Sequence, residues 1–133
     1  MPVIKKLSHV CIYMTDLKEA EKIFVDILGL PYCHEFINAD VKYGFFVNAG
    51  DGTFIEVIKS EIYSVGQKFH ICFETDDIYS LHKALKATHY EISPNVRRAK
   101  SDSVLQFFWF PANLAIEFHQ FDDESLFKIK GLV

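Results

Sequence analysis

Two histidines and two glutamates stand at matching distances along the chain. His9 and His70 are 61 residues apart, and Glu56 and Glu117 are separated by the same 61 residues. Each glutamate therefore follows its histidine by 47 residues. Imidazole and carboxylate ligands suit zinc, nickel, cobalt, iron and manganese ions. The pattern predicts one divalent metal ion, held by two ligands from each half of the chain.

Both glutamates interrupt otherwise apolar segments, which run from residues 53 to 58 and from 114 to 121. Such segments are typical of sheet strands that are covered on both faces. A carboxylate there loses its water, so a cation, a proton or trapped water must offset the cost. A single histidine or glutamate on a strand is more often a packed or solvated residue than a ligand. The duplicated positions favour the metal site.

The repeat extends beyond these four residues. Residues 7–12 read Leu-Ser-His-Val-Cys-Ile, and residues 68–73 read Lys-Phe-His-Ile-Cys-Phe. The offset of 61 also aligns Asp16 with Asp77 and Phe46 with Phe107. A register that persists along the chain indicates an internal duplication. We predict one domain over residues 1–133, with module one at about 5–60, module two at about 66–121 and a tail at 122–133.

Each module predicts the same order of elements, strand, helix and three strands, and therefore an α+β fold. In module one the strands are expected at 7–14, 32–38, 41–48 and 53–59. Thr15-Asp16 caps its helix and Gly29 ends it. In module two Thr75-Asp76-Asp77 caps a helix that runs to about residue 87. Its strands are expected at 67–74, 90–99, 103–110 and 113–121.

The composition bounds the class of protein. Half of the 133 residues are hydrophobic and the net charge is −4, which suits a globular domain and argues against a nucleic-acid partner. No apolar run is long enough to span a membrane, and the N-terminus does not resemble a signal peptide. Three cysteines without a Cys-x-x-Cys pair indicate free thiols. We expect a cytoplasmic protein without a membrane partner.

Two segments resemble a known family. Residues 7–17, Leu-Ser-His-Val-Cys-Ile-Tyr-Met-Thr-Asp-Leu, and residues 28–30, Leu-Gly-Leu, are similar to the first strand and the helix end of the vicinal oxygen chelate superfamily. That superfamily includes glyoxalase I, fosfomycin-resistance enzymes, bleomycin-binding proteins, methylmalonyl-CoA epimerase and extradiol dioxygenases. The resemblance covers about residues 5–121. It implies two β-α-β-β-β modules that form a cupped mixed sheet around the metal, and it implies a homodimer.

The ligand set is similar to that of bacterial glyoxalase I. Epimerases of the superfamily usually carry glutamine at the position of Glu56, and fosfomycin enzymes and extradiol dioxygenases need no ligand there. The resemblance implies a metal-dependent lyase or isomerase, related to lactoylglutathione lyase, that transfers a proton next to a carbonyl through a metal-stabilised enediolate. Glu117 would be the base, with Glu56 as its symmetric counterpart.

Two departures leave the small-molecule substrate open. Glyoxalase I usually has an arginine and an asparagine for glutathione where this chain has Tyr13 and Ser60. One alternative is therefore a non-catalytic protein of the same fold that binds a small molecule or an antibiotic. Another is a thiol transferase or dioxygenase that uses His9, His70 and Glu117 alone.

Other residues are candidates for substrate binding. Arg97, Arg98 and Lys100 could bind an anionic group, although a solvated basic loop has the same composition. Tyr13 should share a strand face with His9, and His119 should share one with Glu117, because residues two apart on a strand point the same way. Ordinary packing explains Tyr13 and His119 equally well.

Overall fold

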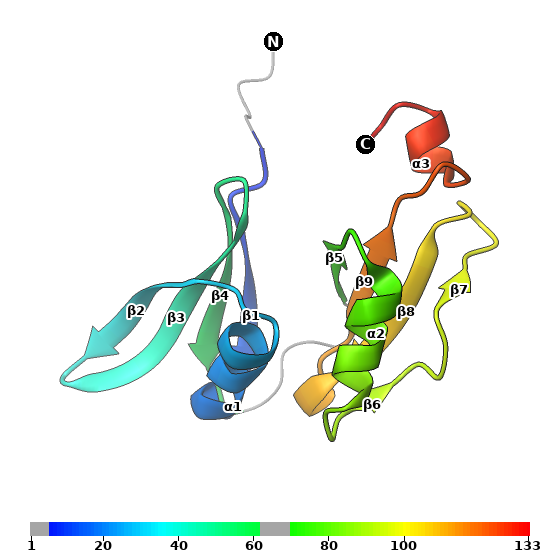
Figure 1. The fold of residues 1–133 in the computed structure, drawn as a ribbon. Helices are drawn as coiled ribbons and strands as arrows, with labels where there is room; N and C mark the ends of the chain where they lie inside the picture. The colour runs from blue at the N-terminus through cyan, green and yellow to red at the C-terminus, as the bar shows by residue number, and fades with distance from the viewer. Residues whose placement is uncertain (1–5, 62–69) are drawn as a thin grey trace, which may run out of the picture. The chain divides into compact units, whose positions relative to one another are not determined.

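The computed structural model describes residues 6–61 and 70–133. The chain divides into two compact units, residues 1–66 and 67–133. Each unit contains one mixed β-sheet with helical turns packed on one of its faces (Figure 1). The predicted α+β class is confirmed. No helix in the described residues is long and apolar enough to cross a membrane.

Unit one follows the predicted order of elements. Its sheet has the order β1-β4-β3-β2, in which β1 runs parallel to β4 and the other pairs are antiparallel. The elements are β1 (His9–Met14), α1 (Leu17–Glu21), the π-helical η1 (Lys22–Ile27), β2 (Tyr32–Asn38), β3 (Val41–Gly50) and β4 (Thr53–Lys59).

The predicted helix ends are present in unit one. The Asp16 carboxylate accepts hydrogen bonds from the backbone N–H groups of Lys18 and Glu19, at 3.0 and 3.1 Å. Gly29 has φ +72°, the left-handed conformation that closes many helices. The π-helical turn was not predicted, because the apolar spacing of this segment does not distinguish it from an α-helix.

Unit two repeats the architecture with a less regular edge. Its sheet has the order β5-β9-β8-β6, and β7 also pairs with β8. The elements are β5 (Ile71–Glu74), α2 (Ile78–Lys86), β6 (Glu91–Ile92), β7 (Arg97–Arg98), β8 (Leu105–Phe110), the 3₁₀ turn η2 (Pro111–Asn113), β9 (Ile116–Gln120) and α3 (Leu126–Ile129).

Two predictions for unit two need refinement. The helix cap is Asp77, whose carboxylate accepts from the Ser80 N–H at 3.1 Å. The strand predicted at 90–99 is two short strands, β6 and β7. Pro94 lies in the break and has no N–H for the ladder. Residues 67–69 of the strand predicted at 67–74 lie outside the described residues.

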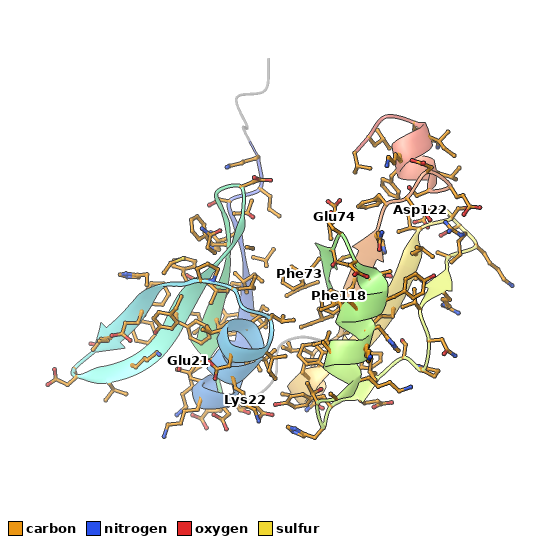
Figure 2. All side chains as sticks on the ribbon, viewed as in Figure 1. Glu21, Lys22, Phe73, Glu74, Phe118 and Asp122 are labelled. Atoms are coloured by element: carbon orange, nitrogen blue, oxygen red, sulfur yellow. The ribbon has the colours of Figure 1, made fainter. Side chains whose placement is uncertain are left out.

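The two faces of each sheet differ in burial. The helix-covered face holds the core, including Phe24, Phe45 and Val57 in unit one and Trp109 and Ile116 in unit two. Phe73 and Phe118 stack side by side from β5 and β9, with ring centroids 6.0 Å apart (Figure 2). The opposite face of each sheet carries the predicted ligands, and we call it the site face.

The sequence alignment of the two modules is one residue out of register at one pair of phenylalanines. The offset of 61 matched Phe46 with Phe107, but Phe46 pairs with Glu56 in the sheet and Phe108 pairs with Glu117. The structural equivalent of Phe46 is therefore Phe108. A register shift between Asn48 and Gly50 adds one residue to the β3–β4 hairpin, which explains the slip.

Gly44 yields a prediction about packing. A Cβ at this position would lie 2.6 Å from the backbone oxygen of Val57 and 2.8 Å from Cδ1 of Ile58. The backbone oxygen cannot rotate away, so Gly44→Ala should lower the free energy of unfolding by about 1–3 kcal/mol. Urea denaturation monitored by circular dichroism would measure this, and an unchanged midpoint would contradict the close approach.

Candidate metal centre

The first His–Glu pair lies on the site face of unit one. His9 is on β1, and Glu56 is on the neighbouring parallel strand β4, opposite Cys11. His9 Nε2 is 4.0 Å from Glu56 Oε1. Phe46 of β3 is the cross-strand partner of Glu56, and its ring meets the His9 ring edge to face at 5.5 Å. The side chains of His9 and Glu56 are only partly buried.

The second pair repeats this arrangement in unit two. His70, immediately before β5, has Nε2 3.3 Å from Oε1 of Glu117 on β9. Phe108 of β8 is the cross-strand partner of Glu117, and its ring meets the His70 ring edge to face at 5.6 Å. The four predicted ligands thus form two equivalent His–Glu pairs, one in each unit, each flanked by one phenylalanine.

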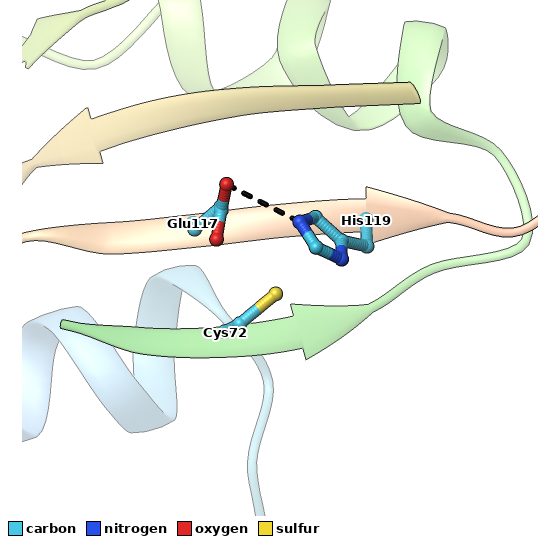
Figure 3. Close-up of side chains that lie close together, drawn as sticks. All are labelled: Cys72, Glu117 and His119. Atoms are coloured by element: carbon cyan, nitrogen blue, oxygen red, sulfur yellow. Dashed lines mark ion pairs between the residues drawn. The ribbon is translucent and has the colours of Figure 1, made fainter. Parts of the chain in front are cut away.

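Glu117 has further neighbours. His119 lies two residues along the same strand, and its Nε2 is 3.2 Å from Glu117 Oε2. Cys72 of β5 is the cross-strand partner of Glu117. The ligand atoms of Cys72, Glu117 and His119 all lie within 4.8 Å of one another (Figure 3). Unit one has Cys11 in the corresponding place but Ile58 where His119 would be.

This arrangement adds to the sequence prediction. His119 was expected to bind substrate, but the structure also brings it against the carboxylate of a predicted ligand. Cys72 was predicted to be a free thiol and was not assigned to the site. Its position two residues after His70, matched by Cys11 after His9, indicates from the sequence that it shares the face of that histidine.

The donor set fits a divalent cation. Glu117 is buried, with only 8% of its surface exposed. A buried carboxylate requires a compensating charge or hydrogen bonds, and in unit two it faces two imidazole rings. Neutral imidazole and ionised carboxylate are ligands that zinc and other first-row divalent ions accept.

The residues of the predicted basic cluster, Arg97, Arg98 and Lys100, lie in different surroundings. Arg98 donates to both carboxylate oxygens of Asp122 at 2.9 and 2.7 Å, and to the Ser103 carbonyl at 2.7 Å. It thereby holds the segment beyond β9, where Figure 2 labels Asp122. Arg97 has the opposite strand parity. It pairs with Gln106, whose other partner is His119, so Arg97 lies on the site face. Lys100 is exposed in the following turn.

Tyr13 and Ser60 lie at the far end of the parallel pair in unit one. Tyr13 is on β1, pairs with Ile58, and has 40% of its surface exposed. The parity of β1 places Tyr13 on the same face as His9. Ser60 follows β4, and its backbone N–H donates to the Met14 carbonyl at 2.9 Å.

Comparison with protein families identifies the fold family. The sequence model of the Glyoxalase/Bleomycin resistance protein/Dioxygenase superfamily matches residues 6–124. The chain belongs to this superfamily. No curated protein sequence matches it significantly. The resemblance inferred from residues 7–17 and 28–30 is thereby confirmed, and the match ends at residue 124, near the start of the tail.

Solved structures of superfamily members share the fold. The fosfomycin resistance protein FosX from Listeria monocytogenes is 17% identical, with a TM-score of 0.74, over 93% of this chain and 99% of FosX. A glyoxalase family protein from Enterococcus faecalis is 19% identical, with a TM-score of 0.71, over 86% of this chain and 97% of that protein.

One of these structures contains a metal. A mutant of the Listeria FosX, 18% identical with a TM-score of 0.74, was solved with Mn(II) and 1S,2S-dihydroxypropylphosphonic acid. The match covers 96% of this chain and 99% of the FosX mutant chain. At such identities the likeness establishes the fold, and activity must be argued from the residues of this chain.

The thiol beside Glu117 provides a test of the local geometry. Burial, and then the Glu117 charge, raise the pKa of Cys72 to about 12, so this thiol stays protonated at neutral pH. In chelator-treated protein, Glu117→Gln should lower that pKa and speed alkylation of Cys72 by iodoacetamide. Mass spectrometry of tryptic peptides would measure the rate at several pH values. An equal rate in both proteins would contradict the contact, and Glu91→Gln in the same unit is the matched control.

The Arg98–Asp122 contact should make stability depend on pH. The Arg98 hydrogen bonds lower the pKa of Asp122, so this carboxylate stabilises the fold at neutral pH. The contribution of Asp122 to the free energy of unfolding is complete above the ordinary aspartate pKa of about 3.9. It disappears as the pH falls through the lowered pKa that Asp122 has in the folded protein. Asp122→Asn should therefore have a lower Tm at pH 7 and the same Tm as the parent in strong acid. If the Tm difference between the variant and the parent stayed constant from pH 7 to strong acid, the dependence of stability on Asp122 ionisation would be refuted.

Proposed function

We propose that the chain is a metal-dependent lyase or isomerase of the glyoxalase I type, which transfers a proton next to a carbonyl. The observation that carries this proposal is the repeated His–Glu pair, with matching phenylalanines, on the site face of each unit. His9, Glu56, His70 and Glu117 would together hold one divalent ion, of zinc, nickel, cobalt, iron or manganese. Once bound, the cation would polarise the substrate carbonyl and stabilise the charge that develops there.

Glu117 is the better placed of the two glutamates to move the proton. Its Oε2 faces His119 Nε2 at 3.2 Å, which orients the carboxylate and offers a partner that can exchange its proton. The equivalent position beside Glu56 holds Ile58, which has no exchangeable proton. Glu56 would therefore act chiefly as a ligand, although it remains the symmetric counterpart of Glu117.

The surroundings support a small anionic substrate other than a glutathione conjugate. Tyr13 and Ser60 stand where glyoxalase I-like enzymes carry residues for glutathione. Arg97, on the site face of unit two, supports binding of an anionic group, and Lys100 is a second candidate. The superfamily resemblance also supports a homodimer, with the metal ligands drawn either from one chain or from two.

Metal content and turnover test the proposal. Protein purified without chelators should contain about one divalent ion per chain by elemental analysis. A panel of hemithioacetals, made from methylglyoxal with glutathione or cysteine, would be followed by NMR in D₂O. Glu117→Gln should lower kcat by about 10²- to 10⁴-fold, the typical loss of a general base. Glu91→Gln, an exposed change on β6, is the control.

Two outcomes would reject the proposal. If Glu117→Gln and Glu56→Gln both kept full activity on a confirmed substrate, this mechanism would be wrong. If the protein bound small molecules but turned over no substrate, with or without a metal, the sequestering alternative would replace the lyase or isomerase proposal. The departures at Tyr13 and Ser60 are the observations that motivate this alternative.

A further inference from the structure

A row of aromatic rings extends from the His–Glu pair of unit one. The Phe46 ring, which meets His9, also lies 5.2 Å from the Phe36 ring and 5.9 Å from the Phe54 ring. Tyr43 stacks on Phe36 at 5.6 Å, with the ring planes 28° apart. We call these four residues, Phe36, Tyr43, Phe46 and Phe54, the aromatic wall.

Gly44 is what allows the wall to be continuous. Phe36 pairs with Gly44 across β2 and β3. A Cβ on Gly44 would lie 3.1 Å from Phe36 Cδ2 and 2.8 Å from Ile58 Cδ1. Without it, the Phe36 ring and the Ile58 side chain close over the backbone. The Phe36 and Ile58 side chains thus meet over Gly44, and the Phe36 ring also adjoins Phe46 beside His9.

The wall is open to a ligand within its own unit. Phe36, Phe46 and Phe54 are only half-buried, and Tyr43 has 42% of its surface exposed. The fully buried aromatic rings of unit one, Phe24 and Phe45, belong to the core on the opposite face. Contiguous exposed apolar surface beside polar site residues is a feature of ligand-binding sites.

The second unit shows that the fold does not require this wall. Gln106 precedes Phe108 by two residues, as Gly44 precedes Phe46, and its cross-strand partner is Arg97. Unit two therefore has Arg97 and Gln106 at the positions of Phe36 and Gly44. A packing requirement of the duplicated sheet would have kept apolar residues in both units.

We propose that the aromatic wall is a subsite for a flat apolar group, such as an aryl ring, carried by a ligand whose oxygens bind the metal. The proposal rests on the metal site proposed above. Rings stack on exposed aromatic side chains through offset or edge-to-face contacts, and removal of their apolar surface from water adds to the attraction. The contact between Phe46 and His9 makes the wall continuous with the predicted ligands.

Two hydroxamates with the same chelating group test the subsite. Benzohydroxamate carries a phenyl ring and acetohydroxamate carries a methyl group. Calorimetric titration of the zinc-loaded chain should give a Kd at least about ten-fold lower for benzohydroxamate. Phe36→Leu keeps an apolar side chain but removes the ring, so it should reduce this preference several-fold without changing the affinity for acetohydroxamate. Tyr43→Leu provides an independent second variant, and Tyr79→Leu, an exposed change on α2, should keep the parent preference.

The possible failures are distinguishable. If the chain takes up neither zinc nor any of the other four candidate metals, or if neither hydroxamate binds the loaded protein, the metal-site proposal and the subsite both fail. If both hydroxamates bind with equal affinity, the subsite alone is overturned. If Phe36→Leu and Tyr43→Leu change the oligomeric state or the Tm but leave the preference intact, the wall packs against protein rather than ligand, and the proposal is again overturned.

Discussion

A carboxylate set in the middle of a sheet strand, beside an imidazole on the neighbouring strand, is the interaction on which the site depends. Glu117 is buried, and its charge is tolerated because His70 and His119 approach both of its oxygens. Parallel pairing of β5 with β9, and of β1 with β4, places the histidine and the glutamate of each unit within reach. The helix-covered core packs against the opposite face of these strands.

The two units carry similar His–Glu pairs whose neighbouring residues differ. Both units have a cysteine opposite the glutamate and a phenylalanine against the histidine. They diverge at the next positions, where unit two has His119 and Arg97 and unit one has Ile58 and Phe36. Because Phe36 and Arg97 occupy equivalent cross-strand positions, these differences change which side chains adjoin each His–Glu pair. At these positions unit two is therefore polar and basic, whereas unit one is apolar.

The superfamily accounts for the fold but leaves the reaction to such local residues. Members that share this architecture at below 20% identity include FosX and glyoxalase family proteins. Within such a scaffold the identity of a few side chains selects the ligand. Here a tyrosine and a serine replace the residues expected for glutathione, and an aromatic surface adjoins a predicted ligand. With Arg97 on the site face of unit two, they support the proposal of a small ligand that carries an anionic group and an apolar ring.

By itself, the sequence determined the pattern that repeats: the His–Glu spacing, the capping residues Asp16 and Asp77, and Gly29 at a helix end. These signals are local or periodic, so they survive without knowledge of packing. The break between β6 and β7 could have been predicted from Pro94, whereas nothing in the sequence distinguishes the π-helical turn of η1 from an α-helix.

Tertiary structure decided what depends on register between distant strands. Strand parity separated Arg97 from Arg98, because adjacent residues point to opposite faces and only Arg98 reaches Asp122. One extra residue in a hairpin made Phe108, and not Phe107, the equivalent of Phe46. The contacts of Glu117 with His119 and Cys72, and the aromatic wall over Gly44, arise the same way. Cross-strand neighbours are set by hydrogen-bond pairing between segments far apart in the chain, which no local pattern records.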